Sequence, residues 1–487
     1  MTESDPEGSR HAEALELAQA GRHEEALAAL QEFLLRHPLD AEALNDAGAL
    51  LYGLGRLDEA ARHLERALGR PDGQAAQVLE NLMEVYLAAG RSAQAAALLD
   101  GLDDAGILTP ELANRTAAAL LEDHDCPNAV ETLLRSRKLA PQEEHLPAIL
   151  RKVHALRPKV ALVCGPGRKP LPDGLAAFVG ERFETRVFRP TGPGALGELL
   201  GWCDLAWFEG CSTEAVLASR MPTACMTLLH VRAAEVYGPR VGRADWSNVD
   251  WVVASGGRQE RDLLARRLPD LARAGRIGHL PVGLAVEKLP FRNRDRGKNL
   301  ACLGDLSCRR NPMGLLQCFR ALHEADGEFR LFFAGYFQDD LLEVYSKHLV
   351  EALHLGGAVR FDGWQEDLPA WLADKHFVVS AAIGEEDGTD IAEAMAMGLK
   401  PVLHDFPGAA DRYGEAALYR TAEEFRRRIL QEPYDPPAYR RFVEEHFALE
   451  SSLARANEFL LHLEARWASA ARADAALEPA PRGEEPR

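Results

Sequence analysis

The sequence predicts an all-α first part, built as a solenoid of helical repeats, followed by an α/β part made of two lobes. Three observations support this fold class. Alanines recur 34, 35 and 34 residues apart near the N-terminus, the apolar pattern changes at Lys159, and short apolar runs then alternate with helical stretches through two successive blocks. A period of about 34 residues indicates stacked helical pairs, and alternating strands and helices indicate parallel sheets.

Each repeat joins two helices through small residues. An alanine lets the antiparallel helices approach closely, and a leucine four positions later fills the space between them. These pairs are Ala26 and Leu30, Ala60 and Leu64, Ala95 and Leu99, and Ala129 and Leu133. We identify the tetratricopeptide pattern, with about four repeats in a domain of residues 1–150. Such an array presents a groove that can hold a polypeptide, although the repeats would also serve as a brace for the rest of the chain.

The remaining chain is expected to form two lobes, at residues 157–292 and 293–469, followed by a disordered tail at 470–487. The tail is rich in Ala, Pro, Glu and Arg. The predicted strands lie at 159–164, 185–188, 204–209, 222–228, 250–255 and 278–283 in the first lobe, and at 299–305, 329–335, 359–363, 377–382, 400–406 and 416–420 in the second. In such sheets, ligands bind beyond the carboxyl ends of the strands.

The net charge of −19 is unevenly distributed, because residues 1–150 hold 27 acidic and 12 basic side chains. This acidity argues against charge-driven contact with nucleic acid or an anionic membrane, and it favours a basic or polar polypeptide as partner. No apolar run approaches the ~20 residues of a membrane span. The eight cysteines form no CxxC pair, and the N-terminus has no apolar signal segment. We therefore expect a cytoplasmic protein without disulfides or a metal site.

The stretch from Ser380 to Val402 is the most informative part of the second lobe. A strand, a Gly-containing loop and a helix that opens near Asp390 follow one another. Asp390 and Glu393 have the spacing of a helix N-cap and its third helical position, so capping alone explains part of the pattern. A second interpretation is that the amides at the helix start bind a phosphate, with nearby carboxylates accepting hydrogen bonds from sugar hydroxyls.

These residues resemble a motif of GT-B glycosyltransferases, in particular the retaining enzymes of glycosyltransferase family 4. Glu385 and Glu393 match the family's Glu-x7-Glu element, and the chain continues Glu-Ala-Met-Ala-x-Gly up to Val402 with one additional residue before Pro401. The resemblance implies that Glu385 contacts the donor sugar and Glu393 the nucleotide ribose. It places the donor phosphates at the backbone of three consecutive residues, Gly388, Thr389 and Asp390.

A second loop resembles the same family. Gly304 to Asn311 follows the first strand of the second lobe and is similar to the loop Gly-Arg-Leu-Ser-x-x-Lys-Gly, whose two cations neutralise the donor diphosphate. Arg310 stands at the Lys position and keeps its charge, whereas Asp305 stands at the Arg position and would repel a diphosphate unless it turns away or bonds elsewhere. By the same resemblance, Gly335 lies on the base side of the nucleotide.

The first lobe resembles the acceptor side of GT-B proteins less closely. Gly165 and Gly167 are similar to its Gly-rich loop, although Gly-Pro-Gly is also a simple turn. The segments 207–211 and 232–237 both follow apolar runs, where cleft residues are expected. Family members often place a histidine near the sugar in the second region. His230 or Arg232 would fill that place, and a structural role for His230 stays open.

Repeats fused to such a module resemble the architecture of protein O-glycosyltransferases, including the O-GlcNAc transferase and bacterial flagellin-modifying enzymes. The sequence therefore predicts a bacterial, metal-independent glycosyltransferase that needs no cofactor besides its nucleotide-sugar substrate. UDP- or GDP-linked sugars are favoured as donors, CMP-linked ones stay open, and flagellin or another protein is the acceptor. Two alternatives remain: a catalytically inactive scaffold, favoured by the acidic Asp305, Glu386 and Asp387, or an enzyme acting on a glycan or lipid-linked acceptor.

Overall fold

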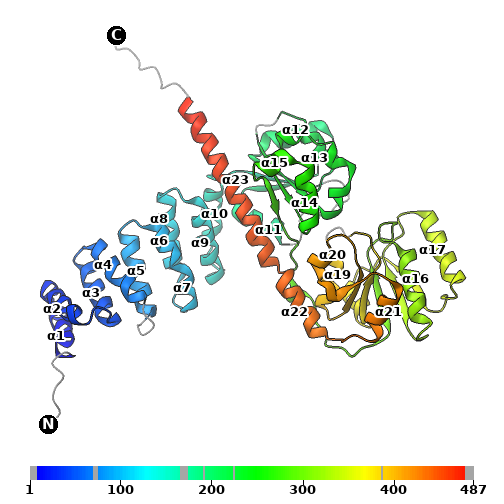
Figure 1. The fold of residues 1–487 in the computed structure, drawn as a ribbon. Coiled ribbons are helices and arrows are strands. Elements are labelled where there is room, and N and C mark those ends of the chain that lie inside the picture. The colour runs from blue at the N-terminus through cyan, green and yellow to red at the C-terminus, as the bar shows by residue number, and fades with distance from the viewer. Residues whose placement is uncertain are drawn as a thin grey trace, which may run out of the picture. The chain divides into compact units, whose positions relative to one another are not determined.

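The computed structural model describes residues 8–69, 75–164, 174–189, 192–222, 225–384 and 388–477, with side chains from residue 10 to residue 469. The chain forms two compact units, residues 1–157 and 158–487. Figure 1 shows the first unit as a helical array and the second as two lobes, each built on a sheet. This is the predicted fold class, a helical repeat region followed by two parallel-sheet lobes.

The first unit consists of antiparallel helices stacked as repeats. Its helices are α1 Gly8–Gln19, α2 His23–Arg36, α3 Ala41–Gly53, α4 Leu57–Leu68, α5 Ala75–Ala88, α6 Ser92–Ala97, α7 Leu99–Asp104, α8 Pro110–Glu122, α9 Cys126–Leu139 and α10 Leu146–His154. The four predicted alanines, at 26, 60, 95 and 129, have no exposed surface. Gly55 turns between α3 and α4 with φ of 75°, a conformation that glycine adopts readily.

The solenoid ends with α10, so the repeat domain extends beyond its predicted boundary at residue 150. Leu146, Leu150 and Val153 pack against the last repeat, where Ala117 and Val130 are also buried. Since α10 covers apolar surface that a further repeat would otherwise cover, it closes the array at its C-terminal end.

The N-terminal lobe contains a six-stranded parallel sheet in the order β2-β1-β3-β4-β5-β6. Its strands are β1 Val160–Cys164, β2 Thr185–Phe188, β3 Leu205–Glu209, β4 Met226–Val231, β5 Trp251–Ala254 and β6 Ile277–His279, and its helices are α11 Leu175–Arg182, α12 Pro193–Trp202, α13 Thr213–Ala218, α14 Arg258–Arg267 and α15 Pro269–Arg273, with short 3-10 turns η1 Ala233–Tyr237, η2 Pro239–Gly242, η3 Trp246–Asn248 and η4 Val286–Lys288. The central strands are buried throughout, as expected for a sheet with helices on both faces.

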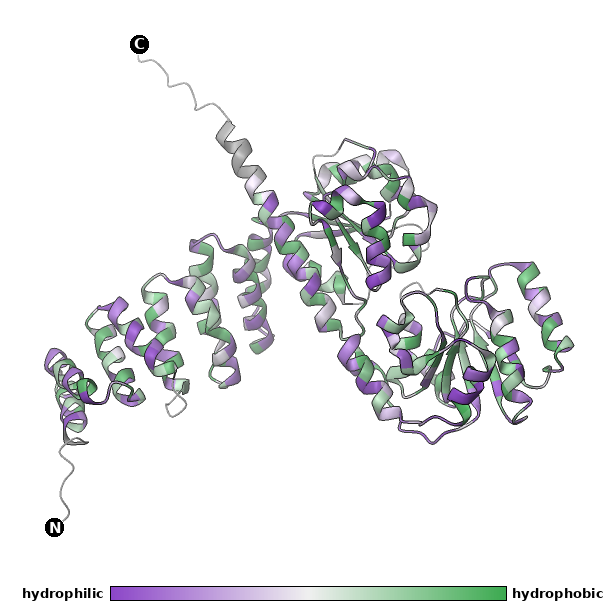
Figure 2. Ribbon diagram, viewed as in Figure 1, coloured by the Kyte–Doolittle hydropathy of each residue, from purple (hydrophilic) through white to green (hydrophobic). Residues whose placement is uncertain are grey.

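The C-terminal lobe repeats this plan with the strand order β12-β11-β10-β7-β8-β9, again all parallel. The strands are β7 Asn299–Leu303, β8 Arg330–Ala334, β9 Val359–Gly363, β10 Phe377–Ser380, β11 Lys400–His404 and β12 Leu418–Tyr419, and the helices are α16 Pro312–His323, α17 Asp340–Ala352, α18 Leu368–Leu372, α19 Thr389–Ala396, α20 Ala409–Tyr413, α21 Ala422–Leu430 and α22 Pro436–His446, with one 3-10 turn, η5 Glu415–Ala417. In Figure 2 the strands of both lobes are largely hydrophobic, whereas the helices around them carry hydrophilic residues.

The last helix corrects two expectations about the end of the chain. Helix α23 runs from Leu449 to Leu477, so residues 470–477 are helical where a disordered tail was predicted. Residues 449–469 were assigned to the second lobe, but Ala456, Leu460 and Leu463 are buried with the core of the first lobe, beside Val160. An apolar stripe at helical spacing shows that a helix must be covered, but it does not show which lobe covers it.

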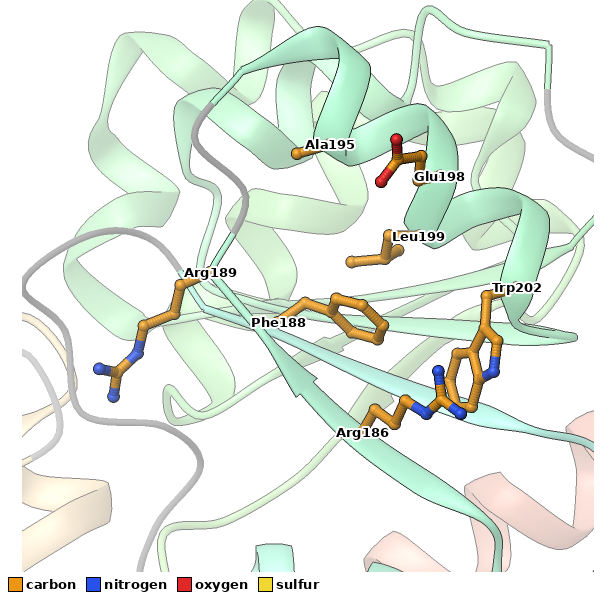
Figure 3. A pocket seen from close by; sticks show the side chains of 7 residues that line it. All are labelled: Arg186, Phe188, Arg189, Ala195, Glu198, Leu199 and Trp202. Carbon is orange, nitrogen blue, oxygen red and sulfur yellow. The ribbon is translucent and has the colours of Figure 1, made fainter.

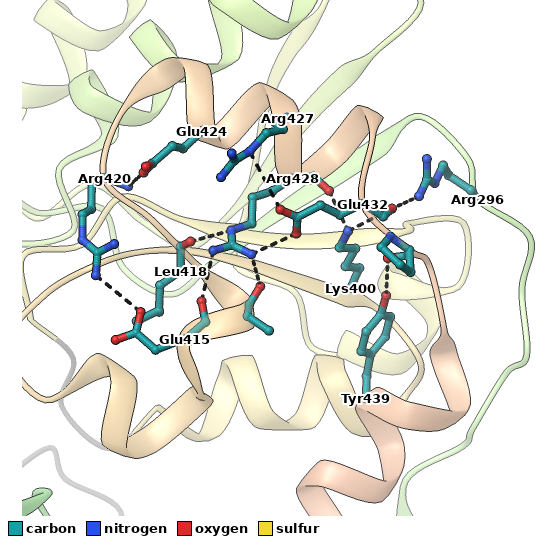
Figure 4. A network of polar contacts seen from close by, with 12 residues as sticks. Arg296, Lys400, Glu415, Leu418, Arg420, Glu424, Arg427, Arg428, Glu432 and Tyr439 are labelled. Atoms are coloured by element: carbon teal, nitrogen blue, oxygen red, sulfur yellow. Dashed lines mark hydrogen bonds and ion pairs between the residues drawn. The ribbon is translucent and has the colours of Figure 1, made fainter.

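A polar network joins α21 to the end of the C-terminal sheet (Figure 4). Arg428 donates hydrogen bonds to the carbonyl oxygens of Leu418, Ala416 and Glu415 and forms an ion pair with Glu432. Lys400 donates from Nζ to the carbonyl oxygen of Arg428 at 2.6 Å, and burial lowers its pKa to about 8. These donors satisfy carbonyl groups that would otherwise be unpaired around the ends of α21 and β12.

None of the helices in the described residues is both long and apolar enough to cross a membrane.

Candidate functional site

The predicted glycines gather where β7, β8 and β9 end. Gly304 follows β7 with φ of 91°, and its N–H donates to the carbonyl oxygen of Ala334 at 2.9 Å. Gly335 follows β8 with φ of 140°, and a Cβ added there would overlap the carbonyl oxygen of Gly304. A Cβ added to Gly304 would lie 2.7 Å from Nη2 of Arg310. Glycine is therefore needed at both positions, because the two loops and the arginine approach one another without room for a side chain.

Asp305 does not face a diphosphate with both oxygens free. Its Oδ1 accepts a hydrogen bond from the N–H of Tyr336 at 3.3 Å, and its Oδ2 accepts one from Gln338 at 3.4 Å. Leu306 also donates from its backbone to the carbonyl oxygen of Tyr336. Asp305 therefore bonds elsewhere, tying the loop after β7 to the loop after β8.

Arg310 is held by the loop that precedes α16. Its N–H donates to Oγ of Ser307 at 3.3 Å, and the next residue, Asn311, has left-handed backbone geometry with φ of 49°. Asn311 caps α16 by accepting from Gly314 at 3.1 Å, and it donates to the carbonyl oxygen of Ala381 at the end of β10. These contacts fix the guanidinium group beside the start of α19.

The start of α19 differs from the predicted capping arrangement. Gly388 is the N-cap, with φ of 69° and no side-chain cap, so Asp390 is the second helical residue and Glu393 the fifth. The Asp390 side chain instead accepts a hydrogen bond from Nη2 of Arg310 at 3.0 Å. Its other oxygen, Oδ1, accepts from the backbone N–H of Ile391 at 3.0 Å, so Asp390 binds both the first turn of α19 and a cation 80 positions earlier in the chain. The helix start, Arg310 and the two glycines meet at one place.

Several predicted site residues lie outside the described residues. These are Glu385, Gly165 and Gly167, together with the two acidic residues Glu386 and Asp387. Thr389 and Glu393 are described and half-buried on α19, close in sequence to Asp390.

The N-terminal lobe brings its predicted residues together around a carboxylate. His230, at the end of β4, is 3% exposed, and its Nδ1 lies 2.9 Å from Oε2 of Glu209 at the end of β3. Arg232 Nη2 lies 3.2 Å from the other oxygen of Glu209. Burial raises the pKa of Glu209, but the charges and hydrogen bonds of His230 and Arg232 outweigh this effect, so that the pKa falls below its ordinary value. Glu209 lies in the segment 207–211, where cleft residues were expected, but no role was predicted for it, although a charged residue that ends a buried strand is a signal for one.

Glu235 and His279 complete this edge of the sheet. Glu235 accepts hydrogen bonds from the backbone N–H groups of Cys211 and Arg232, at 2.9 and 3.1 Å. His279 ends β6, and burial, followed by the positive charges of Arg261, Arg455, Arg412 and His230, lowers its pKa to about 4.

The two lobes touch near these edges. Glu260, in the first turn of α14 of the N-terminal lobe, is 4% exposed. A Cβ added to Gly408, just before α20 of the C-terminal lobe, would lie 3.0 Å from Oε2 of Glu260. This contact joins the segments that follow β5 and β11, at the carboxyl ends of the two sheets.

A pocket of about 300 Å³ lies elsewhere, beside edge strand β2 (Figure 3). The Arg186 guanidinium lies over the ring of Trp202, 4.3 Å from its centroid, and Phe188 packs against the same ring. None of the predicted site residues lines this pocket. The convergence of charged groups at the strand ends is the stronger indication of a functional site, since it joins residues far apart in the chain.

Two family sequence models match the chain. Residues 297–432 match the glycosyl transferases group 1, and residues 11–76 and 46–110 match the tetratricopeptide repeat. The protein therefore carries tetratricopeptide repeats followed by a glycosyl transferase group 1 domain, as the sequence patterns predicted. A comparison with curated proteins gives no match.

Solved structures with a similar fold include the Anabaena protein HepE in complex with UDP. That match has a TM-score of 0.51 at 13% identity and covers 62% of this chain and 100% of HepE. S. aureus TarM matches with a TM-score of 0.45 at 14% identity, over 53% of this chain and 55% of TarM, so the likeness spans about half of TarM. A mutant of the Thermobaculum terrenum O-GlcNAc transferase matches with a TM-score of 0.43 at 16% identity, over 97% and 100% of the two chains. The two six-stranded sheets and the match to HepE identify the second unit as a GT-B fold.

Proposed function

We propose that this protein transfers a sugar from a nucleotide-sugar donor to a polypeptide acceptor that its repeats recruit. The observation that carries the proposal is the convergence of Arg310, Gly304 and the N-terminal end of α19 at the carboxyl edge of the second sheet. A helix N-terminus beside an arginine suits a phosphate group. HepE has been solved in complex with UDP and glucose, which are ligands of the class that such a site would take.

The proposed roles follow the family pattern. Glu393 binds the ribose, Glu385 the donor sugar, and the backbone of 388–390 the phosphates. Arg310 stabilises the departing phosphate without a metal ion, because a preorganised cation needs no reorganisation as charge develops. His230 and Arg232 lie on the opposite lobe, on the sugar side. In a retaining transfer the acceptor hydroxyl attacks on the face from which the nucleotide leaves, and the leaving phosphate takes the proton.

The acceptor side of the proposal rests on the repeats. Asn45, Asn81 and Asn114 stand on the first helices of successive repeats, and Asn81 donates to Oδ1 of Asn45 at 2.9 Å. Amide side chains can hydrogen-bond a peptide backbone whatever its sequence. The acidity of residues 1–150 favours a basic or polar segment of the acceptor, and flagellin is one candidate protein. The cytoplasm is the proposed location, because nucleotide-sugars are the substrates and all eight cysteines lack a disulfide.

Thermal shift and donor hydrolysis with UDP-, GDP-, ADP- and CMP-linked sugars test the donor site on the full chain. We expect one class of donor to raise Tm, and Arg310→Ala and Glu393→Ala to abolish that rise. Glu423→Ala, an exposed carboxylate on α21, is the matched control and should behave as wild type. Stabilisation that survives both site variants, or no response to any donor, would contradict the proposal.

The acceptor is tested by mass spectrometry of candidate proteins incubated with enzyme and donor. The double variant Asn45→Ala, Asn81→Ala should lose transfer to protein while hydrolysing the donor at the wild-type rate. If the enzyme transfers sugar to a glycan or lipid-linked acceptor, and the double variant does so at the wild-type rate, the alternative of an enzyme acting on such an acceptor would be favoured.

A second candidate function is a scaffold that does not catalyse. The ion pair between Arg310 and Asp390 favours it, since a carboxylate occupies the cation that a phosphate would need. If no nucleotide-sugar donor binds, and the full chain still captures the protein that was tested as acceptor, the scaffold function would be supported.

A further inference from the structure

Arg412 differs from the other arginines around the C-terminal sheet. It lies on α20, which follows β11, and its guanidinium forms no hydrogen bond or ion pair with any residue that the structure describes. Its Nη1 is buried. Arg420 and Arg428, by contrast, each bond to carboxylates or carbonyl oxygens (Figure 4). A buried guanidinium N–H without an acceptor is rare, because burial removes its water without replacing it.

The unpaired group of Arg412 lies at the start of α19. A Cβ added to Gly388, the N-cap of that helix, would be 3.3 Å from Nη1 of Arg412. The next residue, Tyr413, donates from its hydroxyl to the carbonyl oxygen of Gly388 at 3.4 Å. The end of α20 is thereby docked against the N-cap of α19, so Arg412 is placed by its neighbour's contact rather than by an ion pair of its own.

Arg310 approaches the same helix start at a different residue. Its Nη2 bonds to Asp390, the second residue of α19, while Nη1 of Arg412 lies near the N-cap residue Gly388. The start of α19 therefore has two arginines beside it. One is shared with Asp390, and the other forms no ion pair with any residue that the structure describes, so both guanidinium groups add their charge to the positive end of the helix dipole.

Arg412 is also close enough to the N-terminal lobe to act on it electrostatically. Its charge is one of those that, after burial, lower the pKa of His279 on that lobe.

The loop after β7 needs such a cation. In the family pattern two cations neutralise the donor diphosphate, but here Asp305 replaces one of them and bonds to the loop after β8. Arg310 alone, already paired with Asp390, would face a diphosphate that carries about two negative charges or more. A second guanidinium, supplied by a different element, would restore the two positive charges that the diphosphate needs.

We propose that Arg412 is the second cation of the donor-diphosphate site, supplied by α20 in place of the loop residue that is Asp305 in this chain. This inference rests on the proposed function, because it takes a nucleoside diphosphate as the ligand of the helix start. Arg412 and Arg310 together hold the diphosphate against the amides of α19. Each forked guanidinium group can donate hydrogen bonds to two phosphate oxygens, which a lysine cannot match in geometry.

Titration calorimetry with UDP, GDP, uridine and guanosine tests the assignment on the full chain. For the diphosphate that wild type binds, Arg412→Gln should raise Kd about tenfold or more, as expected for loss of a hydrogen bond between charged groups. The affinity for the corresponding nucleoside should not change. Arg412→Lys should recover part of the loss, since it keeps the charge and loses the fork.

Arg427→Gln removes the same charge from an exposed position on α21 and serves as the matched control. It should leave Kd within about twofold of wild type, because exposed charges are screened by solvent and salt. Diphosphate affinity that is equal in wild type, Arg412→Gln and Arg412→Lys would overturn the assignment while the donor site stands. If Arg412→Gln fails to fold, Arg412→Lys alone decides: a raised Kd for the diphosphate supports the assignment, and an unchanged Kd overturns it. Wild type that binds neither diphosphate would overturn the proposed function and this assignment together.

Discussion

The carboxyl edges of the two sheets differ in how completely their charged groups are paired. On the N-terminal lobe, Glu209 is bonded to both His230 and Arg232, and its side chain is 1% exposed. On the C-terminal lobe, Arg310 shares a partly exposed ion pair with Asp390, and Arg412 has no partner among the described residues. A cluster that satisfies its own charges fixes a geometry. A cluster whose cations share a single carboxylate beside a helix N-terminus can bind an anion in competition with that carboxylate.

The difference also assigns the lobes different tasks. The N-terminal cluster can hold His230 in one orientation, because a buried hydrogen bond to Nδ1 fixes the ring. The C-terminal cluster can respond to a ligand, since the ion pair of Arg310 and Asp390 keeps 15% and 23% of its two side chains exposed. The following changes would break or sharpen this contrast, from the largest expected effect to the smallest.

Removing the carboxylate of the N-terminal cluster should have the largest effect. Glu209→Ala leaves the buried His230 and the half-buried Arg232 without their shared acceptor, and loss of one partner of a buried ion pair costs about 3–5 kcal/mol. We expect the free energy of unfolding, measured in urea, to fall by about this amount. Glu209→Gln keeps an acceptor oxygen and should lose less. An unchanged free energy of unfolding in Glu209→Ala would mean that the cluster does not hold the lobe.

Removing the C-terminal cation should affect binding and leave stability nearly intact. Arg310→Gln breaks a partly exposed pair, which contributes about 1 kcal/mol or less to stability. Its effect on a nucleoside diphosphate should be about tenfold to a hundredfold in Kd, because the hydrogen bonds it donates are between charged groups. Calorimetry and thermal melts of the same sample check both values. A large drop in Tm with unchanged Kd would reverse the contrast between the lobes.

Asp390→Asn sharpens the comparison by removing the competitor of the phosphate. If Asp390 shares Arg310 with the ligand, the variant should bind the diphosphate more tightly by up to about fivefold, the range expected for an exposed ion pair. Weaker binding would show that Asp390 orients Arg310 for the ligand instead. Glu423→Gln, on the surface of α21, controls for the change in net charge.

The smallest effect is expected on the pH dependence of stability, through protonation of His279. Its folded pKa of about 4 lies below the usual value of 6.5, so between these values the unfolded chain binds more protons. Stability therefore rises as pH rises through this window, and acidification from pH 6.5 toward 4 destabilises the fold. His279→Gln should flatten the dependence of Tm on pH between 4.5 and 6.5. An equally steep dependence in the variant would assign the proton uptake to another group.

Periodic features of the fold were predictable from the sequence. The alanine and leucine that stand at Ala60 and Leu64 have equivalents in every repeat. Strands such as 299–305 are recognisable in the sequence as apolar runs between helices. These patterns are local, since burial imposes them on residues within one element. The placement of α23 was not predictable. Its apolar stripe packs on the first lobe, yet the helix follows the second lobe in the chain.

The candidate site was predictable only in part. The motif around Glu393 and the loop around Arg310 indicated the carboxyl edge of the second sheet, where the structure brings Arg310 and Asp390 together. The helix start did not follow the local capping rule, because Arg310 attracts Asp390. Glu209 and Arg412 carried no motif, so their importance became visible only through their neighbours in space.

The sequence by itself determined the order of the parts, the repeat period, the two parallel sheets and the segments that carry polar residues to their edges. It could do so because hydrophobic periodicity and glycine placement act over short stretches of chain. The tertiary structure alone decided that Asp305 bonds to the loop after β8, that Asp390 pairs with Arg310, and that Arg412, without an ion pair to any described residue, lies beside Gly388. The physical reason is that the free energy of a charge depends on the groups around it, and the fold brings those groups from elements 24 to 80 residues apart.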